Sequence, residues 1–132
     1  QGTTLAWVGP KTVKEHIVPA ISDAAAAAGA SAPRILATLP VCVTSEPSKV
    51  RESIGRGLSM YGKLPSYRAM FEREGVEGPA DLAIVGSAAE GEDGIAALAV
   101  AGGTDLAPSE HCLSTEQRLD TRAVLKTLIQ KE

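Results

Sequence analysis

Lys11 and Thr12 follow the turn residues Gly9 and Pro10, at the start of an expected helix. The free backbone N–H groups and the dipole at a helix N-terminus favour anions, and the lysine adds a positive charge. We therefore expect Lys11 and Thr12 to bind an anionic part of a substrate or cofactor. The competing interpretation is an ordinary solvated lysine on a surface loop.

Gly86 and Ser87 repeat this arrangement after another apolar segment. In barrel enzymes a phosphate commonly binds after such a strand. Serine is also a preferred helix N-cap, and no glycine-rich phosphate motif accompanies this pair. Gly86 and Ser87 are therefore candidates for ligand binding, with helix capping as the alternative.

Three aromatic residues could also contact a ligand. Trp7, the only tryptophan, ends an apolar segment and either faces a pocket or packs beneath a helix. Tyr61 and Tyr67 flank the sequence GKLPS, where they either close over a ligand as a lid or pack the corner between two helices.

Glu110, His111 and Cys112 are consecutive, and their side chains suit acid–base or metal chemistry. Adjacent side chains point apart in most conformations, and no second ligand pair follows at metal-binding spacing. We therefore expect no metal site, and His111 remains a candidate polar group at a pocket. The other cysteine, Cys42, lies in an apolar segment, and two thiols so placed are typical of unpaired cysteines in a reducing cytoplasm.

Strands and helices must position these residues, and the hydrophobic pattern predicts both. Apolar residues at helical spacing alternate with short apolar runs bounded by Gly, Pro and Ser. The expected strands are Thr3–Gly9, Arg34–Thr44, Asp81–Gly86 and Thr104–Ala107. The expected helices are Lys11–Ala28, one capped by Thr44 or Ser45, Leu64–Gly75, Ser87–Ala101, and one from Ser114 or Thr115 to near Lys131.

Two prolines interrupt these elements. Pro19 lies inside the first helix and predicts a kink or break near Ile17 and Val18, because proline lacks a backbone N–H. Pro40 is awkward inside a central strand, so we expect a bulge there or a strand in two parts.

The order of elements is βα, βαα, βα, βα, which is typical of parallel strands with right-handed crossovers. Two architectures fit this order: an open doubly wound sheet, or four consecutive units of an eight-unit barrel. A whole barrel takes about 250 residues, and the chain has 132. The pattern by itself does not separate the two.

Composition narrows the class of protein. Hydrophobic residues make up 44% and charged residues 22%, as in a soluble globular domain, and we expect residues 1–132 to form a single domain. The net charge of −3 gives no reason to expect nucleic-acid binding. No apolar run suits a membrane span and no secretory signal is visible, so a cytoplasmic protein is expected.

The segments LPVCVT, YGKLPSYRAMFEREG and GPADLAIVG occur in this order. With the preceding WVGPKTVKEHIVPAI, they resemble the C-terminal half of the luciferase-like monooxygenase family. The similarity is greatest to its deazaflavin-dependent (coenzyme F-420) oxidoreductases. The resemblance implies an α/β fold that is half of a TIM-type (β/α)8 barrel, with four βα units and parallel strands. It also implies hydride transfer on a small-molecule substrate, with coenzyme F-420 or FMN as the cofactor of the complete enzyme.

In that family most catalytic and cofactor-binding side chains come from the N-terminal half, so no catalytic residue can be assigned here. Lys11 is similar in placement to a lysine that meets a substrate phosphate in some members. The stretch SAAEGEDGIAALAVAGG departs from the family pattern, and we expect its helix to be poorly formed.

Two functions follow from these inferences. The chain is either the C-terminal part of a luciferase-like oxidoreductase, inactive without its N-terminal half, or a non-catalytic half-barrel that dimerises and binds a small anionic ligand. An independent four-stranded binding domain is a third, weaker interpretation. The expected partner is therefore the N-terminal half or a second copy, not a membrane or a nucleic acid.

Overall fold

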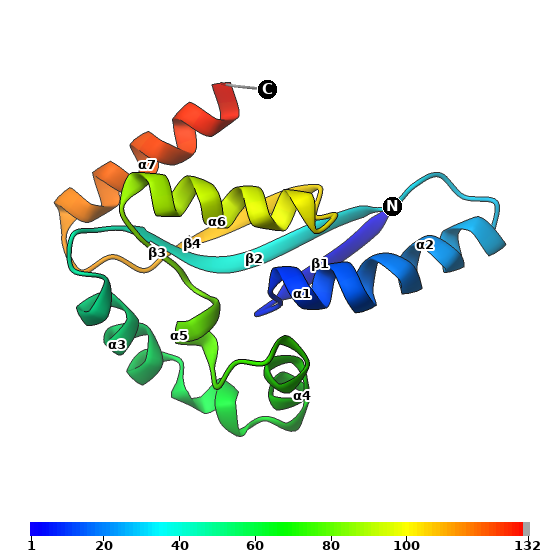
Figure 1. The fold of residues 1–132 in the computed structure, drawn as a ribbon, viewed down its shortest axis with the longest axis horizontal. Helices are drawn as coiled ribbons and strands as arrows, with labels where there is room; N and C mark the ends of the chain where they lie inside the picture. Colours follow the sequence, from blue (N-terminus) through cyan, green and yellow to red (C-terminus); the bar gives the residue numbers. More distant parts are fainter. Residues whose placement is uncertain (131–132) are drawn as a thin grey trace.

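Strand β2, Arg34–Val43, lies in the middle of a four-stranded sheet (Figure 1). The computed structural model describes residues 1–130. Strands β1 (Gly2–Ala6), β3 (Ile84–Gly86) and β4 (Asp105–Glu110) each pair with β2 in parallel. The predicted α/β class with parallel strands is confirmed.

Hydrogen bonds place β1 and β3 on one side of β2 and β4 on the other. Backbone groups of alternate strand residues point to opposite sides. Thr38 accepts a hydrogen bond from the residue after β1, and Thr44, an even number of residues further on, donates one to β3. Ile35 and Val41 lie at the alternate positions of β2, and they accept hydrogen bonds from the residues that flank β4. Consecutive barrel units would place β4 beside β3. The structure instead places β4 beside β2, which offers ten residues for pairing where β3 offers three.

Pro40 is accommodated without the expected bulge or interruption, because β2 is continuous. The backbone N–H that proline lacks would point to the side of β2 that faces β1 and β3. Pairing with β1 ends at Thr38 and pairing with β3 begins at Val41. Pro40 therefore occupies the gap between two neighbouring strands, where no ladder bond is lost.

Helices fill the connections between strands. They are α1 (Pro10–Thr12), the π-helical η1 (Val13–Ile17), α2 (Val18–Ala27), α3 (Pro47–Gly57), the 3-10 helix η2 (Ser59–Lys63), α4 (Pro65–Glu74), α5 (Pro79–Leu82), α6 (Ala88–Val100) and α7 (Thr115–Gln130). The π-helical turn ends just before Val18, where Pro19 predicts a break. The expected end of the last helix near Lys131 lies outside the described residues. Every helix within residues 1–130 is too short or too polar to cross a bilayer.

Helix α6 is better formed than the sequence suggested, and that prediction was wrong. It runs without interruption for 13 residues from a capping box made by Ser87 and Glu90. A Cβ added at Gly94 would lie 2.8 Å from a methyl of Ile84 on β3. The glycine that weakens the isolated helix thus permits its close approach to the sheet.

Helices pack against both faces of β2 near its carboxyl end. Leu39 and Val41 point to one face and pack with Ile84 and with Leu98 of α6. Cys42 points to the other face and packs in a cluster with residues of α3 and β3, namely Val50, Ile54 and Val85. In a barrel the helices form only an outer ring. This end of the sheet is therefore layered on both sides.

Arg34 and Asp105 join the starts of β2 and β4 with two charge-assisted hydrogen bonds. Hydrogen bonds from Arg34 and Thr104 lower the pKa of Asp105 from 3.8 to about 2. A carboxyl whose pKa is lower in the folded state stabilises that state above its unfolded pKa, and the effect is lost as the pH falls through its folded pKa.

We expect Asp105→Asn to flatten the fall in unfolding free energy between pH 3.8 and about 2. Urea unfolding of both proteins across this range measures the difference. An unchanged pH profile in the variant would show that the pair contributes nothing to acid stability.

Candidate functional site

The candidate residues form two groups along β2. Ala6 at the end of β1 is opposite Thr38, whereas Gly86 at the end of β3 is opposite Val43, five residues further along β2. This offset corresponds to about 16 Å. The first group, beside the middle of β2, is Trp7, Lys11 and Thr12, and the second, near its carboxyl end, is Gly86, Ser87 and His111.

The backbone amides of Lys11 and Thr12 already bind an anion of the same chain. The Glu74 carboxylate at the end of α4 accepts bonds from Lys11 N at 3.1 Å, Thr12 N at 2.7 Å and the Thr12 hydroxyl at 2.6 Å. The Thr12 side chain is buried, while Lys11 is exposed. An external anion would have to displace Glu74 from this position.

We expect Glu74→Ala to lower the free energy of unfolding by about 1–3 kcal/mol, since it leaves the buried Thr12 hydroxyl and two amides without their charged acceptor. The matched control is Glu72→Ala on the same helix. Glu72 has a 73% exposed side chain and a 3.7 Å ion pair with Arg68, so its loss should cost less than about 0.5 kcal/mol. Urea unfolding measures both, and equal losses would contradict the assigned role of Glu74.

Trp7 packs into an aromatic cluster with Tyr61 and Tyr67. The Trp7 and Tyr61 ring centres are 5.3 Å apart, and those of Tyr61 and Tyr67 are 4.8 Å apart with nearly perpendicular planes. All three rings are half-buried against the core cluster of β2, α4 and α6. Trp7 has a φ of 59°, which is uncommon for a residue other than glycine. The cluster holds the turn after β1 in this conformation.

Gly86 ends β3, and Ser87 is the N-cap of α6. The Glu90 carboxylate accepts a bond from Ser87 N at 2.7 Å, and the Ser87 hydroxyl accepts one from Glu90 N at 3.3 Å. The bond from the Ser87 backbone is the main cause of a lowered pKa for Glu90. The geometry of Ser87 is therefore that of a helix cap, with its backbone amide bound to an internal carboxylate.

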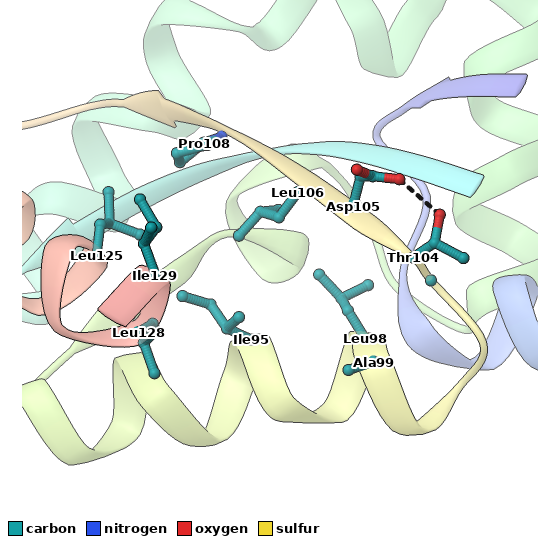
Figure 2. Close-up of a pocket in the computed structure, with 11 residues that line it drawn as sticks. Ile95, Leu98, Ala99, Thr104, Asp105, Leu106, Pro108, Leu125, Leu128 and Ile129 are labelled. Atoms are coloured by element: carbon teal, nitrogen blue, oxygen red, sulfur yellow. Dashed lines mark hydrogen bonds between the residues drawn. The ribbon is translucent and has the colours of Figure 1, made fainter. Parts of the chain in front are cut away.

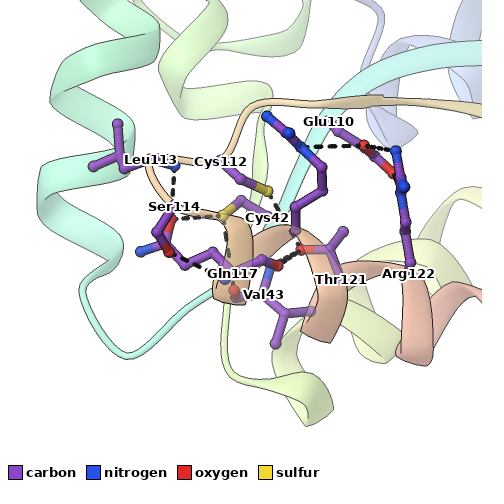
Figure 3. A network of polar contacts seen from close by, with 10 residues as sticks. Cys42, Val43, Glu110, Cys112, Leu113, Ser114, Gln117, Thr121 and Arg122 are labelled. Carbon is purple, nitrogen blue, oxygen red and sulfur yellow. Dashed lines mark hydrogen bonds and ion pairs between the residues drawn. The ribbon is translucent and has the colours of Figure 1, made fainter.

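His111 follows the last residue of β4, and its backbone N–H donates to the Val41 carbonyl on β2. A polar network lies at this carboxyl end of β2 (Figure 3). The Gln117 side chain donates to the buried Thr44 hydroxyl at 2.9 Å and accepts from Leu113 N at 2.8 Å. The fully buried Thr121 hydroxyl accepts from Val43 N at 2.8 Å and donates to the Gln117 carbonyl at 2.7 Å. This network attaches α7 to the sheet where the β4 ladder ends.

Arg122 on α7 forms a bidentate salt bridge with Glu110. Its Nε donates to Oε1 at 2.6 Å and its Nη2 donates to Oε2 at 2.9 Å. Arg118 lies 3.7 Å from the same carboxylate. The hydrogen bond from Arg122 is the main cause of a lowered pKa for Glu110. Glu110 is therefore held as a charged, partnered carboxylate, which suits a positioning role and not proton transfer at neutral pH.

Sequence reasoning missed Glu74, Gln117 and Thr121. The predicted cap of α3 at Thr44 or Ser45 was wrong, because the N-cap is Glu46 and the Thr44 hydroxyl accepts a bond from Gln117. Thr121 and Gln117 extend the apolar stripe of α7 at helical spacing, and this was the available signal. Glu74 carried no signal, because its contacts are more than sixty residues away in sequence.

An apolar groove of about 390 Å³ lies between α6, β4 and α7 (Figure 2). Leu125, Leu128 and Ile129 of α7 face Ile95 of α6 across it. None of the predicted site residues lines the groove. Within residues 1–130, no group of three or more His, Cys, Asp or Glu side chains could hold a metal ion.

The fold and these strand ends define the chain as an α/β protein built on a parallel sheet. No family model and no curated protein matches the sequence. A solved structure of an F420-dependent secondary alcohol dehydrogenase, in complex with an F420-acetone adduct, has a similar fold, with a TM-score of 0.67 at 17% identity. The match covers 91% of this chain and 40% of that one, so the chain spans less than half the length of that protein.

Proposed function

We propose that this chain forms the C-terminal part of a luciferase-like oxidoreductase that uses the deazaflavin coenzyme F-420. In this proposal the catalytic side chains come from an N-terminal half, and residues 1–132 form one domain that completes the barrel. The observation that carries the proposal is the likeness of fold to the F420-dependent alcohol dehydrogenase over 91% of the chain. The resemblance of LPVCVT and GPADLAIVG to this family supports it independently.

Residues 1–130 do not by themselves fit a phosphate-bearing coenzyme such as F-420 or FMN. Glu74 occupies the amides of Lys11 and Thr12, and Glu90 occupies the amide of Ser87. The coenzyme supplies hydride transfer wherever it binds, and a protein supplies orientation and electrostatics. This chain offers a scaffold for that task, and we derive no chemical step from its side chains.

A completed barrel sets a structural condition on the proposal. Strand β4 must then lie between β3 and the first strand of the N-terminal half, whereas here it pairs with β2. A barrel also requires the helices that now pack on both faces of β2 to lie on its outer side only. The positions of β4 and of these helices in the complete protein are therefore criteria for the half-barrel.

Fluorescence titration of residues 1–132 with F-420, and separately with FMN, tests the inactivity of the chain alone. We expect no saturable binding of either coenzyme at micromolar protein. Tight one-to-one binding of either would contradict the dependence on an N-terminal half.

A second candidate is a non-catalytic half-barrel that dimerises and binds a small anionic ligand. One observation favours the dimer: Ile129, at the rim of the groove beside β4, is 73% exposed. Contiguous exposed apolar surface marks association sites, and the groove beside Ile129 is lined mostly by apolar side chains of α6, β4 and α7. Sedimentation velocity over a range of concentrations should then show a dimer that Ile129→Asp dissociates and Lys126→Glu does not. A monomer at all concentrations would rule this candidate out.

A further inference from the structure

Cys42 and Cys112 are far apart in sequence and adjacent in the fold. Cys42 follows Val41 on β2, and Val41 is opposite Glu110, the last residue of β4. Cys112 comes two residues later, so both cysteines lie just past the last residue pair of the β2–β4 ladder. Neighbouring strands are about 4.8 Å apart, which is within the Cα separations that disulfides span.

The two thiols share one buried environment (Figure 3). Cys112 Sγ lies 3.6 Å from Thr121 Oγ1, and Cys42 Sγ lies 3.7 Å from Gln117 Oε1. Cys42 belongs to the buried apolar cluster with Val50 and Ile54, and the half-buried Cys112 packs against this cluster. Burial is the main cause of a raised pKa for the Cys42 thiol, about 12, and a contact with the Cys112 thiol adds to it. The two sulfurs are therefore neighbours in the folded chain, where both are reduced.

We propose that Cys42 and Cys112 are a redox-active pair. They form an intramolecular disulfide by thiol–disulfide exchange with a small-molecule disulfide such as oxidised glutathione. Cys112 is half-buried and Cys42 is fully buried, so the oxidant meets Cys112 first. The Cys112 thiolate attacks one glutathione sulfur, and one glutathione thiolate leaves. Cys42 then gives up its proton and attacks Cys112 Sγ, and the second glutathione leaves as a thiolate that takes up a proton. Two protein thiols are oxidised, and one disulfide is reduced to two glutathione thiols.

The bond would join the end of β2 to the connection between β4 and α7. It would act on the same junction that Thr121 and Gln117 now hold with hydrogen bonds. A disulfide that closes a long loop restricts the unfolded chain and so stabilises the folded state. Oxidation is therefore expected to lock α7 against the sheet.

The test is incubation of residues 1–132 with oxidised glutathione, followed by intact mass measurement and mapping of cross-linked peptides without reduction. We expect a product that has lost two hydrogen atoms and contains a Cys42–Cys112 cross-link. Its melting temperature should be raised by about 5–15 °C and restored by a reductant. Because the Cys42 thiolate is scarce at neutral pH, cross-linking should accelerate as the pH rises.

Two variants separate the pair from a general effect of oxidant. In Cys112→Ser, the buried Cys42 should stay a free thiol, so the intact mass of the variant should not change. The Cys42→Ala variant should stop at a glutathione adduct on Cys112. A wild-type chain that keeps both thiols, stops at the glutathione adduct, or cross-links only between two chains would overturn the proposal.

Discussion

Replacing Phe71 with alanine should lower the free energy of unfolding by about 3–5 kcal/mol, because the change leaves a cavity in a close-packed core. Phe71 is the only phenylalanine of the chain and is 2% exposed. Phe71 extends from α4 into the buried core cluster that also contains Leu39 and Val41 of β2 and Leu98 of α6. One side chain thus joins a peripheral helix to the central strand and to a helix on the same face.

Equilibrium urea unfolding monitored by circular dichroism measures this loss. The control is Leu119→Ala on α7, where the leucine is 61% exposed and its loss should cost less than about 0.5 kcal/mol. Phe71→Leu keeps most of the volume and should cost less than about 1.5 kcal/mol. A Phe71→Ala variant as stable as the Leu119→Ala control would show that α4 does not depend on this contact.

Arg51→Met should lower the free energy of unfolding by about 2–4 kcal/mol, through loss of charge-assisted hydrogen bonds to main-chain carbonyls. The Arg51 guanidinium on α3 donates to the carbonyls of Ala80 at 2.7 Å and of Ala83 and Val85 at 3.1 Å. These carbonyls belong to α5, the following residue and β3. Arg51 therefore holds the approach to β3, a strand too short to be held by its own ladder.

Arg56→Met on the same helix is the matched control. The Arg56 side chain is 74% exposed and has a 3.3 Å ion pair with Glu52, so we expect a change below about 0.5 kcal/mol. Hydrogen exchange of the amides of residues 84–86 in the Arg51 variant provides a second readout. Unchanged protection there, together with unchanged stability, would contradict the role of Arg51.

Local features of the fold were predictable because their causes are local. Apolar runs and turn residues located all four strands, and Pro19 located the irregular turn of the first helix. The apolar pattern places Asp81 in the third strand, but Asp81 belongs to α5, which has Gly78 as its N-cap and Pro79 as its first residue. The observed ends of the strands differ from the predicted ends by a few residues, because backbone pairing and not the side-chain pattern determines where a strand ends.

Strand order and the state of the candidate anion sites were not predictable, because long-range contacts decide both. Nothing in the sequence near Thr104 indicates that β4 pairs with β2 and not with β3. Gly9 and Lys11 indicate a site for an anion, but the carboxylate of Glu74, on a helix distant in sequence, is the anion that binds there. Helix-terminus signals report a preference for negative charge, without indicating whether a ligand or the chain provides it.

In the function that we propose, this chain needs an N-terminal half to bind a deazaflavin. The most direct measurement is F-420 binding, by fluorescence titration, to the protein encoded with the reading frame upstream of Gln1. We expect the frame to continue for about 120–200 residues of alternating strands and helices, as a barrel requires. We expect this longer protein to bind F-420, whereas residues 1–132 do not. A start codon at this point, or a longer protein that still fails to bind F-420, would contradict the proposal.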